Sequence, residues 1–232
     1  SRVYDSDTIL KLHDLPRTML VAGGGVIGSE YACMFAAVGT KVTLVEGRER
    51  LLTFLDPEIF HALAAAMKKL GIDLLLSERI DAVDANDRGF KVHLTSGTTV
   101  KVDNILAATG RSGATGDLNL LQIGVPVNSR GNLSVNATYQ TAQEHIYAVG
   151  DVIGFPALAS TSMEQARIAM VHAFDLKYKT ALAPILPYGI YTIPECSMAG
   201  ATEQSLKEKE IDYVVGGARY DANARGQIIG DE

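Results

Sequence analysis

Cysteine is scarce in this chain, whose 232 residues include only two, Cys33 and Cys196. They lie far apart, which fits neither a disulfide framework nor a CxxC zinc site. Free cysteine is among the most buried residue types, so we expect Cys33 to be a buried packing thiol. The five histidines are scattered without the spacing of metal ligands, and we expect no metal site.

Long apolar runs and an excess of basic residues are also absent. No run approaches the roughly 18–20 apolar residues that span a bilayer. A polar segment, residues 1–7, opens the chain without the basic and apolar regions of a signal peptide. The 21 basic and 27 acidic side chains give a net charge of −6, which disfavours a nucleic-acid partner. We therefore expect a soluble, cytoplasmic protein that binds no nucleic acid and no membrane.

Strand and helix patterns alternate in the first part of the chain, whose composition of 47% hydrophobic and 21% charged residues is typical of globular proteins. Asp56 before Pro57 marks the start of the second helix, and Gly71 marks its end. The alternation predicts βαβαβ, the half-unit of a doubly wound nucleotide-binding fold. Its predicted elements are Thr18–Ala22, 29–38, Lys41–Glu46, 57–70 and 72–76.

The pattern changes after residue 76. Residues 90–94 and Thr99–Val102 alternate polar and apolar side chains on either side of the turn at Ser96 and Gly97, which predicts a β-hairpin. Residues 104–108 are apolar enough to return to the parallel sheet. The Gly-rich stretch that follows marks a boundary.

Beyond this boundary the sequence predicts shorter elements. We expect short strands, including residues 146–151, and a helix over 161–174. Two prolines, Pro184 and Pro187, mark a second boundary. The last segment predicts a strand, a helix capped by Thr202 and a further strand that extends to the chain end at Ile228 and Ile229.

Three glycines follow the first predicted strand with the spacing Gly23-x-Gly25-x-x-Gly28. The first allows a tight turn, the second lets the backbone approach a pyrophosphate, and the third lets helix and strand pack closely. Val26 and Ile27 lie where the helix N-terminus, with its free N–H groups, faces the phosphates. This succession of strand, glycine loop and helix predicts a dinucleotide-binding site.

An acid, Glu46, stands at the end of the next predicted strand. There a carboxylate can accept hydrogen bonds from the 2′-hydroxyl of an adenosine ribose, and it repels a 2′-phosphate, which favours NAD. Arg48 and Arg50 follow closely and are placed to pair with that phosphate, which favours NADP. The choice between NAD and NADP, or the use of both, stays open.

Several stretches, in order along the chain, resemble the flavoprotein disulfide reductases, a family of FAD-dependent pyridine nucleotide oxidoreductases. Residues 20–32 contain VAGGGVIGSEYA, which is similar to the family's NAD(P)-binding motif. The sequence ATGR at 108–111 is similar to its A-x-G-R turn, and TAQEHIYAVGD at 141–151 to its second flavin motif. Residues 191–195 and 200–203 are similar to the opening of its dimerisation domain.

Within that family, residues 111–115, 139–143 and 189–195 resemble the soluble, Si-specific pyridine nucleotide transhydrogenases most closely. This resemblance implies FAD, NAD and NADP as cofactors and reversible hydride transfer between NADPH and NAD⁺ as the reaction. A dihydrolipoyl dehydrogenase-like disulfide oxidoreductase is the alternative, because Glu46 and the V-I-G sequence at 26–28 suit that branch as well. A third possibility is an isolated NAD-binding module without turnover.

The resemblance assigns the flavin-side roles to five residues. Asp151 would accept a hydrogen bond from a ribitol hydroxyl of FAD. Ala157, Leu158 and Ala159 would approach the flavin ring at a helix N-terminus, where backbone N–H groups stabilise negative charge. Glu30 matches an acid that pairs with a lysine near the flavin, and that lysine is not in this chain.

On the nucleotide side, the resemblance places Gly110 against the nicotinamide nucleotide and Ile80 beside the adenine. Val26 stands where some family members carry a gating tyrosine, so we expect no aromatic gate. These roles, like those on the flavin side, follow from the resemblance alone.

The resemblance also implies an α/β fold and a division of the chain. Residues 1–115 would form a Rossmann-like, doubly wound NAD(P)-binding domain with a β-hairpin or meander insertion. Residues 116–184 would be the C-terminal part of the FAD-binding domain, and 185–232 the start of an α+β dimerisation domain. The family's N-terminal FAD half and the rest of its dimerisation domain would lie outside the chain. We therefore expect a fragment that is inactive alone and forms a homodimer at full length.

Overall fold

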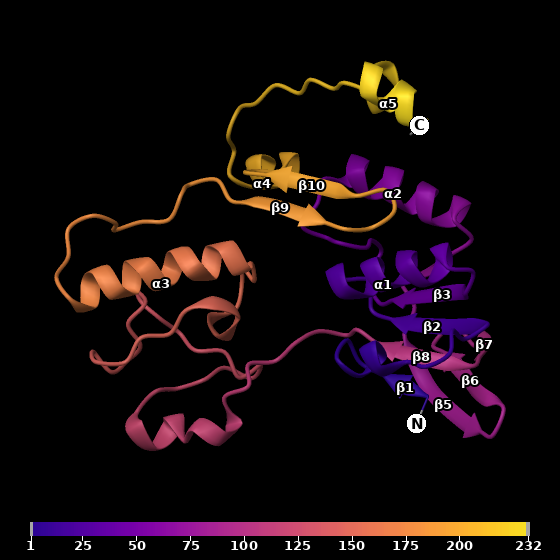
Figure 1. Cartoon of the computed structure of the whole chain (residues 1–232), viewed down its shortest axis with the longest axis horizontal. Helices are drawn as coiled ribbons and strands as arrows, with labels where there is room; N and C mark the ends of the chain where they lie inside the picture. The colour runs from indigo at the N-terminus through magenta and orange to yellow at the C-terminus, as the bar shows by residue number, and fades with distance from the viewer. Residues whose placement is uncertain (1, 231–232) are drawn as a thin grey trace. The chain divides into compact units, whose positions relative to one another are not determined.

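A computed structural model describes residues 2–230 of the chain. These residues form two compact units that divide after Gly200. The larger unit holds every strand of the described chain (Figure 1). Asp231 and Glu232, which follow the last predicted strand, lie outside the described residues.

A five-stranded parallel sheet forms the centre of the larger unit, in the order β1-β8-β2-β3-β4. Helix α1 connects β2 to β3, and helix α2 connects β3 to β4. The predicted βαβαβ alternation is confirmed, although α1 begins three residues earlier than expected and the pairing of β1 with β8 was not predicted. The bounds are β1 Val3–Tyr4, β2 Thr18–Ala22, α1 Val26–Ala37, β3 Lys41–Glu46, α2 Pro57–Lys69, β4 Asp73–Leu76 and β8 Asn104–Ala107.

Helix α2 begins and ends where the sequence places its signals. Asp56 has the extended backbone of an N-cap residue, and Pro57 fills the first helical position, where a missing N–H costs nothing. Phe60, Leu63 and Met67 are the buried residues of this helix, spaced three and four apart on one face. That spacing is what lets the helix cover the sheet.

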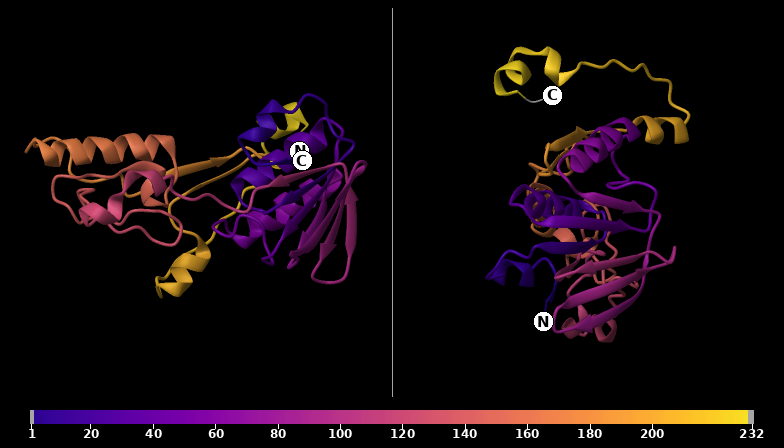
Figure 2. Two further views of the ribbon diagram at one scale, coloured as in Figure 1. Left: turned by 90° about the horizontal axis from the view of Figure 1, so that it is seen from below. Right: turned by 90° about the vertical axis from the view of Figure 1, so that its right-hand side faces the viewer.

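The two faces of the sheet are covered differently, as Figures 1 and 2 show. On β2, Met19 and Val21 belong to an apolar cluster that also contains the buried side chains of α1 and α2. Leu20 and Ala22, which point to the opposite face, belong to a second cluster with β6 and β7. The strand residues are therefore buried on both faces, as their continuous apolar run predicted.

An antiparallel β-meander, in the order β5-β6-β7, covers the second face. Its strands are β5 Ile80–Asn86, β6 Gly89–Leu94 and β7 Thr99–Val102. The β6–β7 pair is the predicted hairpin, and its turn contains Gly97 with a positive φ. Strand β5 extends the hairpin to a meander. Its Ile80 is half-buried against the second apolar cluster, and the other residues of β5 are exposed.

Residues 110–184 contain one long helix and little sheet. Helix α3, Ala159–Ala173, agrees with the predicted helix, whereas the expected strand over 146–151 is wrong. That run forms one isolated bridge, between Tyr147 and Gln140, before a 3₁₀ turn begins at Gly150. A strand needs a neighbour to take its backbone hydrogen bonds, and this run has that neighbour at a single position.

The short 3₁₀ helices of the larger unit are η1 Thr8–Lys11, η2 Gly116–Leu118, η3 Leu120–Ile123 and η4 Gly150–Ile153.

A hairpin of β9 Pro187–Ile190 and β10 Cys196–Ala199 completes the larger unit. Ile190 and Cys196 belong to the same buried cluster as Cys33 of α1. Cys33 has no exposed surface, which confirms the expected packing role. Burial also raises the pKa values of both thiols, so neither is a ready thiolate.

The smaller unit, described from residue 201 to 230, contains α4 Glu203–Glu208, η5 Tyr220–Ala222 and α5 Ala224–Ile229. Thr202 caps α4 as predicted, and it does so in a reciprocal capping box with Ser205. The further strand predicted here is wrong, because Ile228 and Ile229 lie in α5, which Asn223 caps. An isolated strand is unstable without a partner, whereas a capped helix satisfies its hydrogen bonds locally.

Across the part of the chain that the structure describes, no helix is long and apolar enough to cross a membrane.

We expect Leu106→Ala to lower the free energy of unfolding by about 2–5 kcal/mol, because Leu106 lies in β8 with 0% exposure and its truncation leaves a cavity. The measurement is urea unfolding followed by circular dichroism. The control is Leu121→Ala, whose side chain is 74% exposed and should change that value by less than about 0.5 kcal/mol. Equal losses in the two variants would contradict the assignment of the sheet as the core.

Candidate nucleotide-binding site

Three strands of the parallel sheet end side by side at its carboxyl edge. The Gly23 N–H donates to the Val45 carbonyl at 2.8 Å, and the Ala108 N–H donates to the Ala22 carbonyl at 2.8 Å. These bonds join the segments that follow β2 and β8 to the neighbouring strand ends. In open α/β sheets, ligands bind in the crevice at this edge, where the order of strands changes direction. Here β3 and β4 follow on one side of β2, and β8, which comes later in the chain, lies on its other side.

The first and third glycines of the loop are required by close backbone packing. Gly23 has φ +107°, and a Cβ there would lie 2.4 Å from the Ala108 carbonyl oxygen. At Gly28 a Cβ would lie 1.9 Å from the Gly23 carbonyl oxygen. Real side chains do not approach backbone that closely. The missing side chain at Gly28 therefore lets the first turn of α1 lie on the loop after β2, and the one missing at Gly23 lets that loop lie on the segment after β8.

The second glycine differs from the other two, because it faces open space. Gly25 is the N-cap of α1, and a Cβ at this position would have no heavy atom within 4 Å. The Ser29 N–H makes the first hydrogen bond of the helix, to the Gly25 carbonyl at 2.9 Å. The N–H groups of Val26 and Ile27 precede this bond, as do those at the start of any helix. This end of α1 therefore offers N–H groups and the positive end of its dipole to an anion.

Gly24 was not among the predicted site residues, yet a side chain at this position would also meet a neighbour. A Cβ on Gly24 would lie 2.3 Å from Cδ2 of the buried Leu51. The Gly24 carbonyl accepts a hydrogen bond from the Leu52 N–H at 3.1 Å. The loop after β3 thus folds back onto the glycine loop, and the run of three glycines was the signal for this contact.

Glu46 ends β3 as a buried carboxylate whose side chain is 8% exposed. Its Oε2 accepts from the Gly24 N–H at 2.7 Å, and its Oε1 accepts from the Arg48 N–H at 2.9 Å. Burial raises the pKa of Glu46, but the hydrogen bonds from Arg48 and Gly24 outweigh that effect and hold the pKa below its ordinary value. The acid is therefore ionised, and it joins the end of β3 to the glycine loop.

Arg48 covers the outer side of this carboxylate. Its Nε donates to Oε1 of Glu46 at 2.9 Å, and its terminal NH2 group donates to Oε2 at 3.1 Å. The Arg48 side chain is 54% exposed, so the guanidinium lies between Glu46 and solvent. Its pKa is raised by the hydrogen bond to Glu46. Spacing alone did not predict that these two residues bind each other.

Gly110 follows a strand of the parallel sheet, and Ile80 lies on the meander that packs against that sheet. Gly110 follows β8, is exposed and has φ +132°, which favours glycine. Ile80 begins β5, is half-buried and packs against the second apolar cluster, which contains Val45 of β3. The structure thus gathers the glycine loop, Glu46, Arg48 and Gly110 at one edge, with Ile80 on the neighbouring meander.

The residues predicted for the flavin side lie on a second group of elements. Asp151 is exposed in η4, and Ala157, Leu158 and Ala159 lie at the start of α3, where Leu158 is the N-cap. Like those of α1, the first N–H groups of this helix precede its internal hydrogen bonds. Asp151 and this helix end therefore present an acceptor and several donors to the surroundings.

Gln165, which the sequence did not single out, holds the turn before Asp151. It is a polar side chain of α3 with 2% exposure, and its Oε1 accepts from the Gly150 N–H at 2.7 Å. Asn132 supports the same turn by donating to the Asp151 carbonyl at 3.3 Å. The sequence did not predict that Gln165 is buried, because its hydrogen-bond partner is a backbone group fifteen positions away.

Glu30 has a protein partner in this structure. Its Oε1 accepts from the Tyr191 N–H at 2.8 Å, which links α1 to the segment between β9 and β10. The predicted role of Glu30 near a flavin is a separate matter and stays a prediction.

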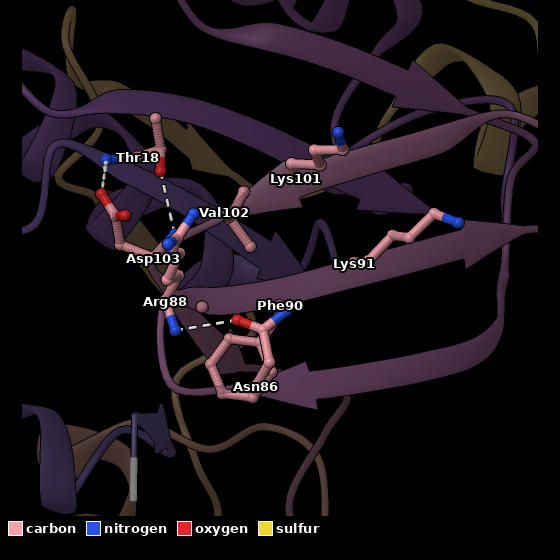
Figure 3. Close-up of a pocket in the computed structure, with 9 residues that line it drawn as sticks. Thr18, Asn86, Arg88, Phe90, Lys91, Lys101, Val102 and Asp103 are labelled. Carbon is pink, nitrogen blue, oxygen red and sulfur yellow. Dashed lines mark hydrogen bonds between the residues drawn. The ribbon is translucent and has the colours of Figure 1, made fainter.

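A surface cleft of about 430 Å³ lies on the meander, and no residue of the glycine loop lines it. Figure 3 shows its lining residues. At its wall, Thr18 and Asp103 exchange hydrogen bonds from their backbone N–H groups to each other's side chains. Thr18 begins β2, so the cleft is at the amino edge of the sheet, opposite the carboxyl edge at which open α/β sheets generally bind ligands. None of the predicted site residues lines it. The lining residues are Thr18, Asn86, Arg88, Gly89, Phe90, Lys91, Lys101, Val102 and Asp103.

No group of three or more histidine, cysteine, aspartate or glutamate side chains within residues 2–230 is arranged to hold a metal ion.

Comparison with known proteins places these features in a family. The profile of the pyridine nucleotide-disulphide oxidoreductase family matches residues 1–172. Soluble pyridine nucleotide transhydrogenases from Mycobacterium bovis and Aliivibrio fischeri are 49% and 48% identical over 99% and 100% of the chain. The chain spans 49% of the length of either relative, about half.

Solved structures of flavoprotein disulfide reductases are similar to this chain as well. The HOCl-induced flavoprotein disulfide reductase RclA from Escherichia coli is similar with a TM-score of 0.91 and 31% identity. The similarity covers 99% of this chain and 53% of that protein.

Gly25→Ala and Gly28→Ala should separate binding from folding. Gly25→Ala has room for its methyl group, so we expect unchanged thermal stability and an affinity for NADH lower by about tenfold, since the methyl occupies the approach of a phosphate. Gly28→Ala forces backbone apart and should lower the melting temperature by several degrees. Calorimetric titration and thermal denaturation measure the two effects. Unchanged NADH affinity in Gly25→Ala would contradict the site.

Glu46 gives a pH dependence of stability with a defined sign. Its pKa in the folded chain is below the ordinary 4.5, so its contribution is present above pH 4.5 and is lost as pH falls through the folded-state pKa. We expect Glu46→Gln to be less stable than the unmodified chain at pH 7, with the difference shrinking below pH 4.5. Urea unfolding across this range is the measurement, with Glu49→Gln in the same loop as the control. A difference independent of pH would contradict the ionised pairing.

Proposed function

Because the chain belongs to the pyridine nucleotide-disulphide oxidoreductase family, we propose that it holds the NAD(P)-binding half of an FAD-dependent oxidoreductase. We propose that the protein containing it at the length of its relatives transfers hydride between NADPH and NAD⁺. The observation that carries the proposal is the meeting of the glycine loop, the α1 N-terminus and the Glu46–Arg48 pair at one sheet edge.

The residues at this edge fit a dinucleotide. Gly25 leaves open space beside the N–H groups of Val26 and Ile27, which would bind the pyrophosphate. Glu46 and Arg48 would bind the adenosine ribose, Ile80 would flank the adenine, and Gly110 would lie along the nicotinamide half. Their common task is to fix the orientation of the nicotinamide, because positioning is the protein's main contribution in cofactor chemistry.

The residues on η4 and α3 fit part of an FAD site. The exposed carboxylate of Asp151 would accept from a ribitol hydroxyl, and Gln165 holds the backbone turn that aims it. The start of α3, at Ala157, Leu158 and Ala159, would stabilise negative charge on the flavin ring. When bound, FAD supplies the group that accepts hydride from one nucleotide and returns it to another. Glu30 is proposed as an acid near that ring.

Two further features belong to this proposal. We assign residues 1–115 to the NAD(P)-binding domain, 116–184 to the FAD-binding domain and 185–232 to the start of the dimerisation domain, as the motif order supports. We also propose a cytoplasmic homodimer at full length. The two free, buried thiols suit a reducing compartment, and the resemblance of residues 191–195 to a dimerisation domain supports the dimer.

A disulfide oxidoreductase is the second candidate. It is favoured by the similarity to the flavoprotein disulfide reductase RclA, at 31% identity. The transhydrogenases share 48–49% identity over the same residues, which is why hydride transfer between nucleotides is preferred. A nucleotide-binding module without turnover is the third, and it describes what we expect of residues 1–232 by themselves.

The deciding experiment uses the full-length protein and two assays, reduction of thio-NAD⁺ by NADPH and reduction of lipoamide by NADH. We expect turnover in the first and little in the second, and Gly25→Ala should lower the rate at subsaturating NADPH by about tenfold. Rapid lipoamide reduction with no thio-NAD⁺ reduction would overturn the transhydrogenase proposal. Residues 1–232 alone should bind NADH without retaining flavin, and a stoichiometric flavin absorbance would contradict the division of the FAD site.

A further inference from the structure

We infer that Arg48 lets a single site accept both NAD(H) and NADP(H), by exchanging its partner between the Glu46 carboxylate and a 2′-phosphate. The inference rests on the proposed nucleotide site. From the sequence, the choice of nucleotide stayed open, because Glu46 favours NAD whereas Arg48 and Arg50 favour NADP. The inference makes Arg48 the residue that permits both.

The geometry of the pair is the first support. The guanidinium binds both oxygens of Glu46 in the forked arrangement that arginine also makes with phosphate. Glu46 is buried and Arg48 is about half exposed, so the surface offered to a nucleotide at this position is cationic. A 2′-phosphate that arrives here therefore meets the guanidinium before the carboxylate.

The second support is that Glu46 remains satisfied when Arg48 leaves. Its two oxygens accept from the Gly24 and Arg48 backbone N–H groups at 2.7 and 2.9 Å. A buried carboxylate without donors is costly, but this one keeps one backbone N–H on each oxygen. An outward movement of the Arg48 side chain therefore leaves both carboxylate oxygens hydrogen-bonded.

The third support is that contacts other than those of the Arg48 side chain hold most of the loop, to which that side chain adds one hydrogen bond, from Nη1 to Oγ1 of Thr53 at 3.3 Å. The Arg48 carbonyl accepts from the Ser77 N–H at 3.0 Å, and the Glu46 carbonyl accepts from the Glu78 N–H at 3.0 Å. Leu51 and Leu52 of the same loop are buried against the glycine loop. Backbone bonds and apolar packing therefore fix the loop, and the guanidinium is left to respond to a ligand.

The two nucleotides would then use the pair differently. With NAD(H), the ribose 2′-hydroxyl donates to Glu46, whose charge Arg48 continues to balance. With NADP(H), the 2′-phosphate takes the guanidinium as its partner, and the same cation offsets the repulsion between phosphate and Glu46. One ion pair replaces another, which is why neither nucleotide is excluded.

The test is equilibrium titration of the full chain with NAD⁺, NADP⁺ and 2′,5′-ADP. We expect Arg48→Ala to weaken NADP⁺ relative to NAD⁺ by about tenfold or more, with 2′,5′-ADP following NADP⁺. Arg48→Lys should lie between, because an ammonium keeps the charge but not the fork. Glu46→Gln should shift the ratio the other way. Arg88→Ala, a cation of the meander cleft, is the matched control and should shift neither affinity.

The outcomes separate the inference from the proposed function. If the unmodified chain binds both nucleotides and Arg48→Ala leaves their affinity ratio unchanged, the exchange is wrong while the nucleotide site stands. If the unmodified chain binds NAD⁺ alone, Arg48 is a fixed partner of Glu46 and the inference also fails. If it binds neither nucleotide, the proposed function fails, and the inference fails with it.

Discussion

The close contact between the first turn of α1 and the end of β2 is the constraint on which the rest of the larger unit depends. The missing side chain at Gly28 lets the first turn of α1 lie against the Gly23 carbonyl, and the one missing at Gly23 lets the same loop lie against the segment after β8. This contact fixes the direction of α1, and so decides which of its residues join the buried cluster on the sheet. The same contact leaves the helix N-terminus open at the sheet edge, so packing and anion binding have a common origin.

Much of the fold was predictable because local signals and burial agreed. Asp56, Pro57 and Gly71 mark the two ends of α2. The continuous apolar strands are buried on both faces, as their patterns indicated. The failures share a physical cause. The run at 146–151 and the pair Ile228–Ile229 have strand-like composition, but strand formation depends on a partner elsewhere in space, which a local pattern does not contain.

The site was predictable by residue type and less so by contact. The positions of Gly25 and Glu46 followed from spacing, because a glycine loop and the next strand end meet in any such sheet. The fork of Arg48 on Glu46, the packing of Gly24 on Leu51 and the bond from Gly150 to Gln165 did not follow. Each depends on side-chain rotamers or on a loop path, and no period in the sequence records these.

The β9–β10 hairpin has a consequence for motion. Ile190 and Cys196 share the buried cluster of Cys33, and the Tyr191 N–H is bonded to Glu30, so hairpin and helix cover each other's apolar surface. Neither can detach without exposing the other to water. Hairpin and α1 should therefore open as one cooperative segment in amide hydrogen exchange, and slow exchange at the glycine loop's helix depends on a hairpin more than 150 positions away in the chain.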